Sequence, residues 1–278
     1  MNRRWIMAGL AISGGAIGCS GARADLKYTT EMHMGATGGQ PMHTMTTMVK
    51  KNARRMETTQ RIGSAQTRTI SLTLCDKKQE IRLDPAQKIY TVAPLGGAVG
   101  NGASATSGGS AGRLGTGKIV NTSSIKFLGE ETIAGTKTRH YLVKNRMQTS
   151  GCAGNTDLTS QMEIWVAPGL KEPGGCQEGM DPAQAMASAF GGCKVTFVQQ
   201  GDAAAYRKAY NGLVLRMKMV GEGGRPGMTQ QVSALSRAPL SASLFTIPAG
   251  YKKVSAQEFQ QAQTAAMMKA MSGGAQQD

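Results

Sequence analysis

Strict alternation of apolar and polar residues is the feature that most constrains what this chain can fold into. Between residues 26 and 34, one set of alternate residues is mostly apolar and consists of Leu26, Tyr28, Thr30, Met32 and Met34. The residues between them are polar: Lys27, Thr29, Glu31 and His33. A period of two places successive side chains on opposite faces of a β-strand. The same alternation returns over 70–74 and 213–219. We therefore expect a sheet with one apolar face.

Further strands are predicted along most of the remaining chain. They are expected at 26–34, 42–50, 54–62, 69–74, 80–83, 88–92, 119–129, 131–144 (a hairpin that turns at Ala134-Gly135), 162–166, 194–199, 213–220 and 229–235. Short turns between consecutive strands favour an antiparallel meander over a parallel sheet. The predicted fold class is mainly β (α+β), with one or two short helices and a C-terminal helix.

Three other segments depart from the strand pattern. Residues 94–117 consist mostly of Gly, Ala and Ser, and we expect a flexible insertion. Asp181 and Pro182 are typical of a helix start, and this short helix should end at Gly191-Gly192. Ser255 and Glu258 form a capping box for a helix within 255–278, which should dock on the sheet or fray. One β domain is thus expected over 25–254, followed by the C-terminal helix and tail over 255–278.

The first 24 residues are expected to be an export signal. Arg3 and Arg4 precede the uncharged apolar run from Trp5 to Gly18, and Ala22-Arg23-Ala24 is an A-x-A cleavage site. The mature chain should then begin at Asp25 in the periplasm. The paired arginines fit either the general route or the twin-arginine route. Cys19, after Ala16-Ile17-Gly18, is a candidate lipidation site that would make the protein an outer-membrane lipoprotein.

The net charge of the chain limits the classes of molecule that it is expected to bind. The formal charge is +15, and the signal contributes three arginines and no acid, so residues 25–278 carry 15 − 3 = +12. Such a charge favours anionic envelope surfaces and lipid head groups, or serves solubility alone. Nucleic acid is not expected, because the Lys and Arg residues are scattered and no stretch interleaves them with aromatic residues.

Cysteine usage points to disulfide bonds rather than to a metal. Apart from Cys19, the chain has four cysteines, and three of them flank the irregular segment 151–193; the four are Cys75, Cys152, Cys176 and Cys193. Four cysteines in an exported chain suggest two disulfides with three alternative pairings. No C-x-x-C pair occurs, and the spacings match no zinc-ligand pattern.

No catalytic motif is present in the sequence. The chain lacks a G-x-S-x-G elbow, a phosphate-binding P-loop and an H-E-x-x-H helix. Glu130 and Glu131 are adjacent on an expected strand, so they point to opposite faces and cannot share a proton. We expect a protein that is not an enzyme and holds no cofactor.

Methionine and histidine gather near the N-terminus of the mature chain. The candidate ligands for a soft metal such as Cu(I) or Ag(I) are Met32, His33, Met34, Met42, His43 and Met45. A hairpin between the first two strands would make the two groups neighbours. The alternative is that these methionines are flexible apolar filling in a cavity wall, since the chain contains 18 of them.

Several blocks resemble a known family. They are Phe127 to Tyr141 with its G-x-x-T-x-x-Y hairpin, Met162 to Ala167, and the closing Phe245-Thr246-Ile247-Pro248-Ala249-Gly250-Tyr251. Over residues 26–254, the sequence resembles an uncharacterised family of exported bacterial domains related to the Lol-type lipoprotein carriers. The resemblance implies a strongly curved, half-open antiparallel sheet wrapped around helices, with an apolar concave face.

Three functions remain in view from the sequence. The leading hypothesis is a non-catalytic exported protein that binds a lipid or another amphiphile on the concave face. The second is soft-metal binding at the methionine and histidine cluster. The third is an interaction module of the cell envelope, which docks on a protein through the Gly/Ser insertion and the C-terminal helix.

Overall fold

The strands form one curved sheet in the computed structural model. The structure describes residues 25–35, 40–62, 65–95, 115–171, 193–220 and 226–273. Within these residues, the sheet has thirteen strands in the order β10-β7-β8-β9-β11-β12-β1-β2-β3-β4-β5-β6-β13. The expected fold class, a mainly β and unclosed curved sheet with few helices, is confirmed.

The elements have the following bounds. The first six strands are β1 (Leu26–Met34), β2 (His43–Lys50), β3 (Ala53–Ile62), β4 (Ala65–Leu74), β5 (Gln79–Asp84) and β6 (Ile89–Pro94). The remaining strands are β7 (Thr116–Ile133), β8 (Thr136–Gly151), β9 (Thr156–Ala167), β10 (Lys194–Gly201), β11 (Leu213–Val220), β12 (Pro226–Ser236) and β13 (Lys252–Lys253). The helices are α2 (Ala203–Ala209) and α3 (Ala256–Gly273), and the 3₁₀ turns are η1 (Cys75–Lys77) and η3 (Ala242–Phe245).

The topology differs from a pure antiparallel meander at three places. β1 lies in the middle of the sheet, because it pairs with both β2 and β12. At the two ends of the sheet, β10 pairs with β7 and β13 pairs with β6, and both pairs are parallel. The expectation of antiparallel pairing throughout was therefore wrong at the edges, where long connections return the chain in the same direction.

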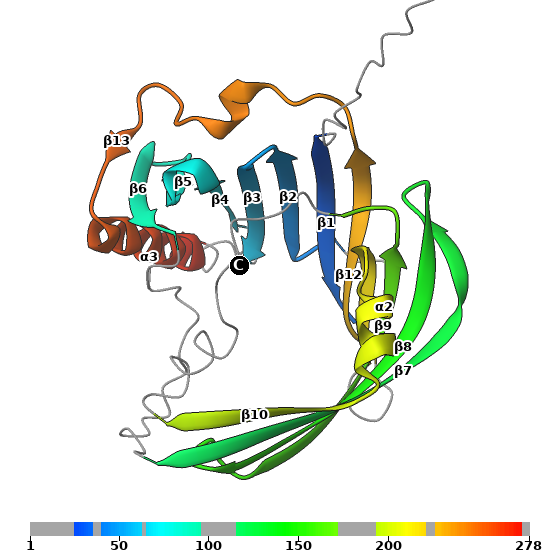
Figure 1. Cartoon of the computed structure of the whole chain (residues 1–278). Coiled ribbons are helices and arrows are strands. Elements are labelled where there is room, and N and C mark those ends of the chain that lie inside the picture. The colour runs from blue at the N-terminus through cyan, green and yellow to red at the C-terminus, as the bar shows by residue number, and fades with distance from the viewer. Residues whose placement is uncertain are drawn as a thin grey trace, which may run out of the picture.

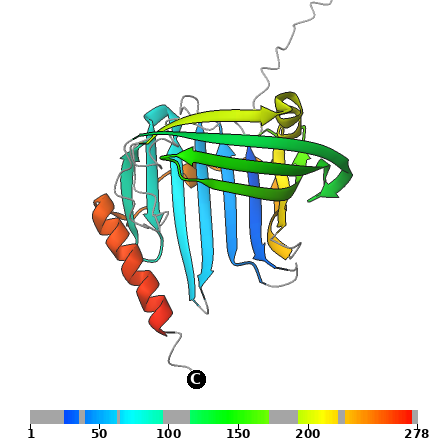
Figure 2. The same ribbon diagram turned by 90° about the horizontal axis from the view of Figure 1, so that it is seen from below.

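The sheet curls round a hollow and so has an inner and an outer face (Figures 1 and 2). The segment 237–251 crosses the outer side, where Ile247 and Tyr251 pack on a cluster that contains Ile70. Ile70 pairs with Glu57 of β3, Glu57 pairs with Thr46 of β2, and Thr46 pairs with Thr29 of β1. Paired residues share a face, so the odd-numbered residues of β1 lie on the outer face. By strand alternation, Met32 and Met34 then lie on the inner face.

Different parts of the chain cover the two faces. On the outer face, the cluster covered by segment 237–251 consists of Ile70, Leu72, Ile81 and Leu83. On the inner face, α2 contributes Ala209 to a cluster with Tyr141, Val143, Ile164 and Val166. A third cluster joins β1, β2, β9, β11 and β12 and includes Leu26, Tyr28, Trp165 and Leu215.

Several expectations concern segment boundaries. β8 continues to Gly151 and β9 starts at Thr156, so the segment from 151, which we expected to be irregular, contains the beginning of a strand. Polar cross-strand pairs such as Arg146 with Asp157 hold these strands together, and apolar alternation does not reveal such pairs. Phe245, the first residue of the closing block, is buried at the end of the 3₁₀ turn η3.

Other expectations were confirmed or lie outside the described residues. The capping box is present, because Ser255 Oγ accepts from the Glu258 N–H and Glu258 Oε2 accepts from the Ser255 N–H. The helix docks on the sheet through Phe259, which is buried, and α3 contacts β4 and β6. The signal with Cys19, most of the insertion 94–117, the helix expected after Asp181, and Cys176 lie outside the described residues.

A disulfide fixes the place where β7, β8 and β10 meet. Cys152 and Cys193 are bonded, with a Cα–Cα distance of 5.8 Å and a sequence separation of 41 residues. Cys75 is disulfide-bonded as well. A Cβ atom on Gly117 would lie 2.8 Å from the Ala153 nitrogen and 3.0 Å from Cys193 Sγ, so only glycine fits beneath the bridge.

The carboxylate of Asp25 joins the start of β1 to the chain that follows β12. Asp25 Oδ2 accepts the Leu240 N–H at 2.7 Å and lies 2.8 Å from Lys50 Nζ. The hydrogen bond from Leu240 and the ammonium of Lys50 lower the pKa of Asp25 below its ordinary value of 3.8. The charged form is therefore favoured in the folded protein.

Acid should weaken this Asp25 contact. The stabilisation is fully present above the ordinary pKa and is lost as the pH falls through the lowered pKa. We expect Asp25→Asn to reduce the free energy of unfolding at pH 7 by about 1–3 kcal/mol and to flatten its dependence on pH below about 4. Urea unfolding at several pH values measures both effects. Asp76→Asn, at an exposed carboxylate, is the control, and an acid dependence unchanged in Asp25→Asn contradicts the assignment.

Removing the Cys152–Cys193 bridge should destabilise the domain. A bond that closes a loop of this size contributes about 2–4 kcal/mol, so the Cys152→Ser/Cys193→Ser double variant should unfold at lower urea. Reduction of the parent protein should cost more, because Cys75 is bonded too. Equal urea midpoints for the parent and the double variant would show that the bridge does not hold these strands.

Candidate functional site

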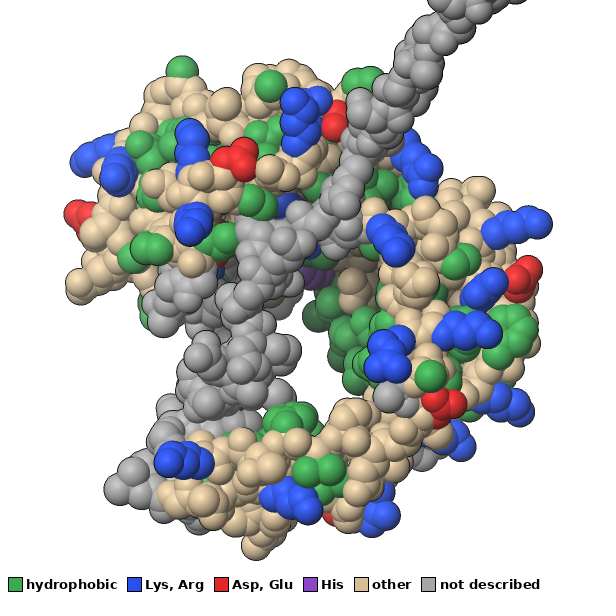
Figure 3. Space-filling model, in the orientation of Figure 1, with side chains coloured by type: hydrophobic (Ala, Val, Ile, Leu, Met, Phe, Trp, Pro, Cys, Tyr) green, Lys and Arg blue, Asp and Glu red, His purple; other side chains and the backbone are tan. Residues whose placement is uncertain are grey.

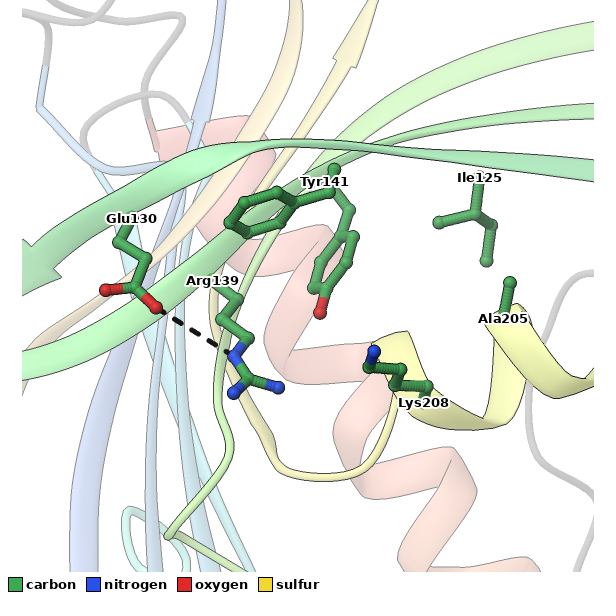
Figure 4. Close-up of a pocket in the computed structure, with 7 residues that line it drawn as sticks. Ile125, Glu130, Arg139, Tyr141, Ala205 and Lys208 are labelled. Atoms are coloured by element: carbon green, nitrogen blue, oxygen red, sulfur yellow. Dashed lines mark ion pairs between the residues drawn. The ribbon is translucent and has the colours of Figure 1, made fainter.

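A pocket lies on the inner face, between the β7–β8 hairpin and α2. It has a volume of about 420 Å³, and its lining consists of Ile125, Phe127, Glu130, Arg139, Tyr141, Ala205 and Lys208. One wall is apolar and aromatic, and the rim carries two cations and one carboxylate (Figure 4). Such a combination of apolar wall and few polar groups is typical of a small-molecule site.

Strand register brings the hairpin residues of the pocket together. Arg139 pairs with Glu130 and Tyr141 pairs with Phe127, so all four side chains project from the same face. A β-bulge between Phe127 and Gly129 keeps both pairs in phase by absorbing one extra residue, Leu128. Glu130 and Glu131 thus point to opposite faces, as their adjacency in the sequence predicted.

The second wall of the pocket is the short helix α2. The helix begins at Asp202, whose side chain accepts the Ala205 N–H at 2.8 Å. Beyond its end, Tyr210 reaches the sheet, with its hydroxyl 3.8 Å from Met162 Sδ. Burial, and the neighbouring Tyr206, raise the pKa of Tyr210, so this hydroxyl stays protonated. The anchors at both ends of α2 fix Lys208 at the rim.

The aromatic wall is open to the hollow. The Phe127 ring lies edge-on to the Tyr141 ring, with 5.6 Å between the ring centroids. Tyr141 is buried, whereas Phe127 is 53% exposed. The exposed Phe127 ring therefore gives the pocket an apolar side that is open to solvent.

The inner face continues away from the pocket as a methionine-rich stripe. Val143 of β8 pairs with Met162 of β9, and Met162 pairs with Met219 of β11. On the next two strands, Met228 of β12 pairs with Met34 of β1. The neighbouring row runs from Ile164 through Met217 and Gln230 to Met32. Met34 is 62% exposed and Met219 is 37% exposed. Apolar side chains line the hollow, as the space-filling view shows (Figure 3).

The opposite face of the same strands carries a polar and aromatic network. Trp165 stacks on His140 at a centroid distance of 4.0 Å, and the Arg216 guanidinium lies 5.0 Å from the Trp165 ring. Glu131 accepts from Trp165 Nε1 at 2.6 Å and from Arg216 Nη1 at 2.8 Å. His140 Nε2 lies 2.9 Å from Glu163.

This network stabilises the sheet. Desolvation alone would raise the pKa of Glu131, but the hydrogen bonds from Arg216 and Trp165 outweigh it and lower the pKa. Glu131 therefore stays ionised and ties β7 to β9 and β11 across the sheet. Glu131, His140, Glu163 and Arg216 each have a side-chain partner within this network.

Strand register divides the six predicted metal ligands between two faces. Met32 lies directly opposite His43, and Met45 lies opposite Thr30, so these side chains share the inner face with Met34. His33 lies on the outer face, 3.5 Å from Glu31. The Met42 carbonyl accepts the Arg61 N–H at 3.0 Å, so Met42 continues the β2–β3 register beyond His43 and Gln60 and, by alternation, lies on the outer face.

Two further observations concern metals and membranes. No group of three His, Cys, Asp or Glu side chains suited to a metal ion occurs in the described part of the chain. None of the helices in these residues is both long and apolar enough to cross a membrane.

The sequence did not reveal the pocket residues. Arg139, Glu130 and Lys208 look like ordinary surface charges, and the helix that carries Lys208 has only seven residues. The signals that could have indicated the site are Asp202 as an N-cap residue and the alternation of Ile125 with Phe127 on the expected strand.

Several solved structures match this chain at low similarity. An uncharacterized conserved protein from Thermus thermophilus matches with 11% identity and a TM-score of 0.38, over 84% of this chain and 90% of that one. PNGF-II matches with 9% identity and a TM-score of 0.37, over 86% of this chain and 32% of that one. MucB matches with 11% identity and a TM-score of 0.35, over 82% of this chain and 58% of that one.

The chain thus spans about a third of the PNGF-II chain and somewhat more than half of the MucB chain. A further match is the complex of MucA and MucB from Pseudomonas aeruginosa, with 10% identity and a TM-score of 0.33, over 84% of this chain and 59% of that one. The comparison with curated proteins found no match. A family model described as "Domain of unknown function (DUF4412)" matches residues 28–251, so this chain belongs to the DUF4412 family.

Proposed function

We propose that this protein is an exported, non-catalytic binding protein that holds an amphiphilic ligand on the inner face of its sheet. The observation that carries the proposal is the unburied methionine-rich stripe, which ends in large exposed side chains at Met34 and Met219. Domains usually bury such residues, and a contiguous apolar face left open indicates a binding surface. The export signal expected in the first 24 residues supports a role in the envelope.

The side chains of the stripe suit a variable apolar chain. Methionine is unbranched and polarizable, so it adapts to ligands of different shape. The curved sheet supplies a rigid backbone beneath these flexible side chains. The resemblance to lipoprotein carriers points in the same direction, since an apolar concave face is what that resemblance implies.

Polar substitution in the stripe should weaken ligand binding. We expect Met34→Gln/Met219→Gln to bind the neutral apolar probe N-phenyl-1-naphthylamine at least about tenfold more weakly, because each methionine side chain that the probe fully covers contributes roughly 1.5–3 kcal/mol. Fluorescence titration measures the affinity, and native mass spectrometry detects lipid that co-purifies with the parent protein.

Two exposed methionines on α3 provide a matched control for this experiment. Met267→Gln/Met268→Gln makes the same chemical change outside the stripe and should leave probe binding unchanged. A parent protein that neither carries nor takes up an apolar ligand would overturn the proposal. Equal losses in both double variants would show that the effect is not local to the stripe.

A second candidate function is soft-metal binding on the inner face. The direct pairing of Met32 with His43, with Met45 and Met34 adjacent on the same face, favours it. Thioether and imidazole ligands select Cu(I) over harder cations. The site would then consist of the inner-face residues alone, and His33 and Met42 would not be ligands, since they lie on the outer face.

The two faces make the metal hypothesis testable with matched variants. Met32→Leu/His43→Ala should weaken Cu(I) binding at least about tenfold if both are ligands, as measured by competition with bathocuproine disulfonate. His33→Ala/Met42→Leu changes the same residue types on the same strands and should have no effect. Identical Cu(I) affinities for the parent and both variants would exclude this site.

A further inference from the structure

We propose that the pocket between the β7–β8 hairpin and α2 binds an oxyanion, and that this oxyanion is the phosphate or carboxylate head group of the amphiphile. The inference rests on the proposed function, because it assigns one end of the ligand to a defined place on the same inner face. It adds a polar subsite to a surface that is otherwise apolar.

Two cations from different elements face this pocket. Arg139 projects from β8 and Lys208 projects from α2, and both line the same space (Figure 4). The side chain of Lys208 has no ion pair or hydrogen bond within the described residues. Arginine offers a planar fork of donors that matches carboxylate and phosphate oxygens, and lysine adds a mobile point charge.

The Tyr141 hydroxyl adds a neutral donor. It points into the pocket beside Arg139 and Lys208 (Figure 4). In the part of the chain that the structure describes, this hydroxyl has no hydrogen-bond partner, although the Tyr141 side chain is buried. A hydroxyl held by a buried ring is already oriented, so little side-chain entropy is lost when it binds an anion.

Glu130 is the one carboxylate in the lining, and it does not block the site. Its nearest oxygen lies 4.0 Å from Arg139 Nε, at the limit of an ion pair, and the Arg139 and Glu130 side chains are 41% and 61% exposed. Exposed ion pairs of this kind contribute little stability. A phosphate group, which can accept from Arg139, Lys208 and Tyr141 together, can therefore displace Glu130 from Arg139 at small cost.

The apolar wall explains why the anion should belong to an amphiphile. Ile125 and the exposed Phe127 ring form the side of the pocket opposite the cations, and free inorganic phosphate would leave this wall in water. An acyl or aromatic group attached to the head group would cover it and gain the free energy of apolar burial. A free oxyanion gains nothing from Phe127.

The test uses two ligands that differ only in phosphate. Isothermal titration of the full chain compares 1-lauroyl-glycerol 3-phosphate with 1-lauroyl-glycerol, and inorganic phosphate forms a third arm. We expect the parent to bind the phosphorylated lipid at least about tenfold more tightly than the neutral lipid. Arg139→Gln/Lys208→Gln should abolish this preference and leave the affinity for 1-lauroyl-glycerol unchanged.

The same two strands provide a charge-matched control. Lys126 and Lys144 are exposed on the face of β7 and β8 opposite the pocket. Lys126→Gln/Lys144→Gln removes two positive charges and should keep the full preference for phosphate. Tyr141→Phe removes only the hydroxyl, and we expect it to reduce the preference by a smaller factor.

Each outcome separates the subsite from the function on which it rests. If the preference survives in Arg139→Gln/Lys208→Gln, or falls equally in the control, the subsite is refuted while amphiphile binding stands. If inorganic phosphate binds as tightly as the phosphorylated lipid, the head-group assignment is overturned in favour of a free oxyanion. If neither lipid binds and inorganic phosphate binding depends on Arg139 and Lys208, the pocket is an anion site and the proposed function fails.

Discussion

Backbone pairing along one curved sheet is the interaction on which the rest of this structure depends. Each residue of a strand has a fixed partner on its neighbours, and alternate side chains take opposite faces. The row that joins Tyr141, Ile164 and Met217 to Met32 therefore remains on the inner face across β8, β9, β11, β12 and β1. A shift of one residue in any of these pairs would transfer part of the stripe to the outer face.

The two faces of the sheet are covered in different ways. The chain after β12 covers the outer face, where Ile247 and Tyr251 pack on the cluster around Ile70. On the inner face, α2 covers the part beneath Ala209 and Tyr210, while Met34 and Met219 remain exposed. Two short polar contacts, at Asp25 and at Asp202, position the covering segments. This division explains how one sheet can combine a stable core with an apolar surface that faces solvent.

Strand alternation in the sequence was sufficient to predict most of the sheet and the C-terminal helix. Residues 26–34 alternate because the inner side of β1 is apolar, and Ser255 with Glu258 forms the cap that their spacing predicts. In β11, a β-bulge between Val214 and Arg216 interrupts the alternation, so Leu213 lies opposite Ala167 whereas Met217 lies opposite Ile164 on the other face. The end of β8 and the start of β9, where Arg146 pairs with Asp157, consist mostly of polar residues, so the extent of these two strands could not be predicted from apolar alternation. The pocket was missed for another reason. Arg139, Tyr141 and Lys208 meet only after a bulge has set the register of one hairpin and a seven-residue helix has folded back over it.

The parallel strand β10 affects the order in which this molecule can form. β7 and β8 are joined by a two-residue turn and can pair locally, whereas Lys194 meets Thr116 only after the intervening chain has been made. Contacts of such long sequence separation slow folding, because loop-closure entropy is lost before the contacts form. The Cys152–Cys193 bond lies at the start of this late pairing. Once formed, it keeps the start of β10 beside β7 and β8, so the parallel pairing no longer depends on closing the loop between residues 152 and 193.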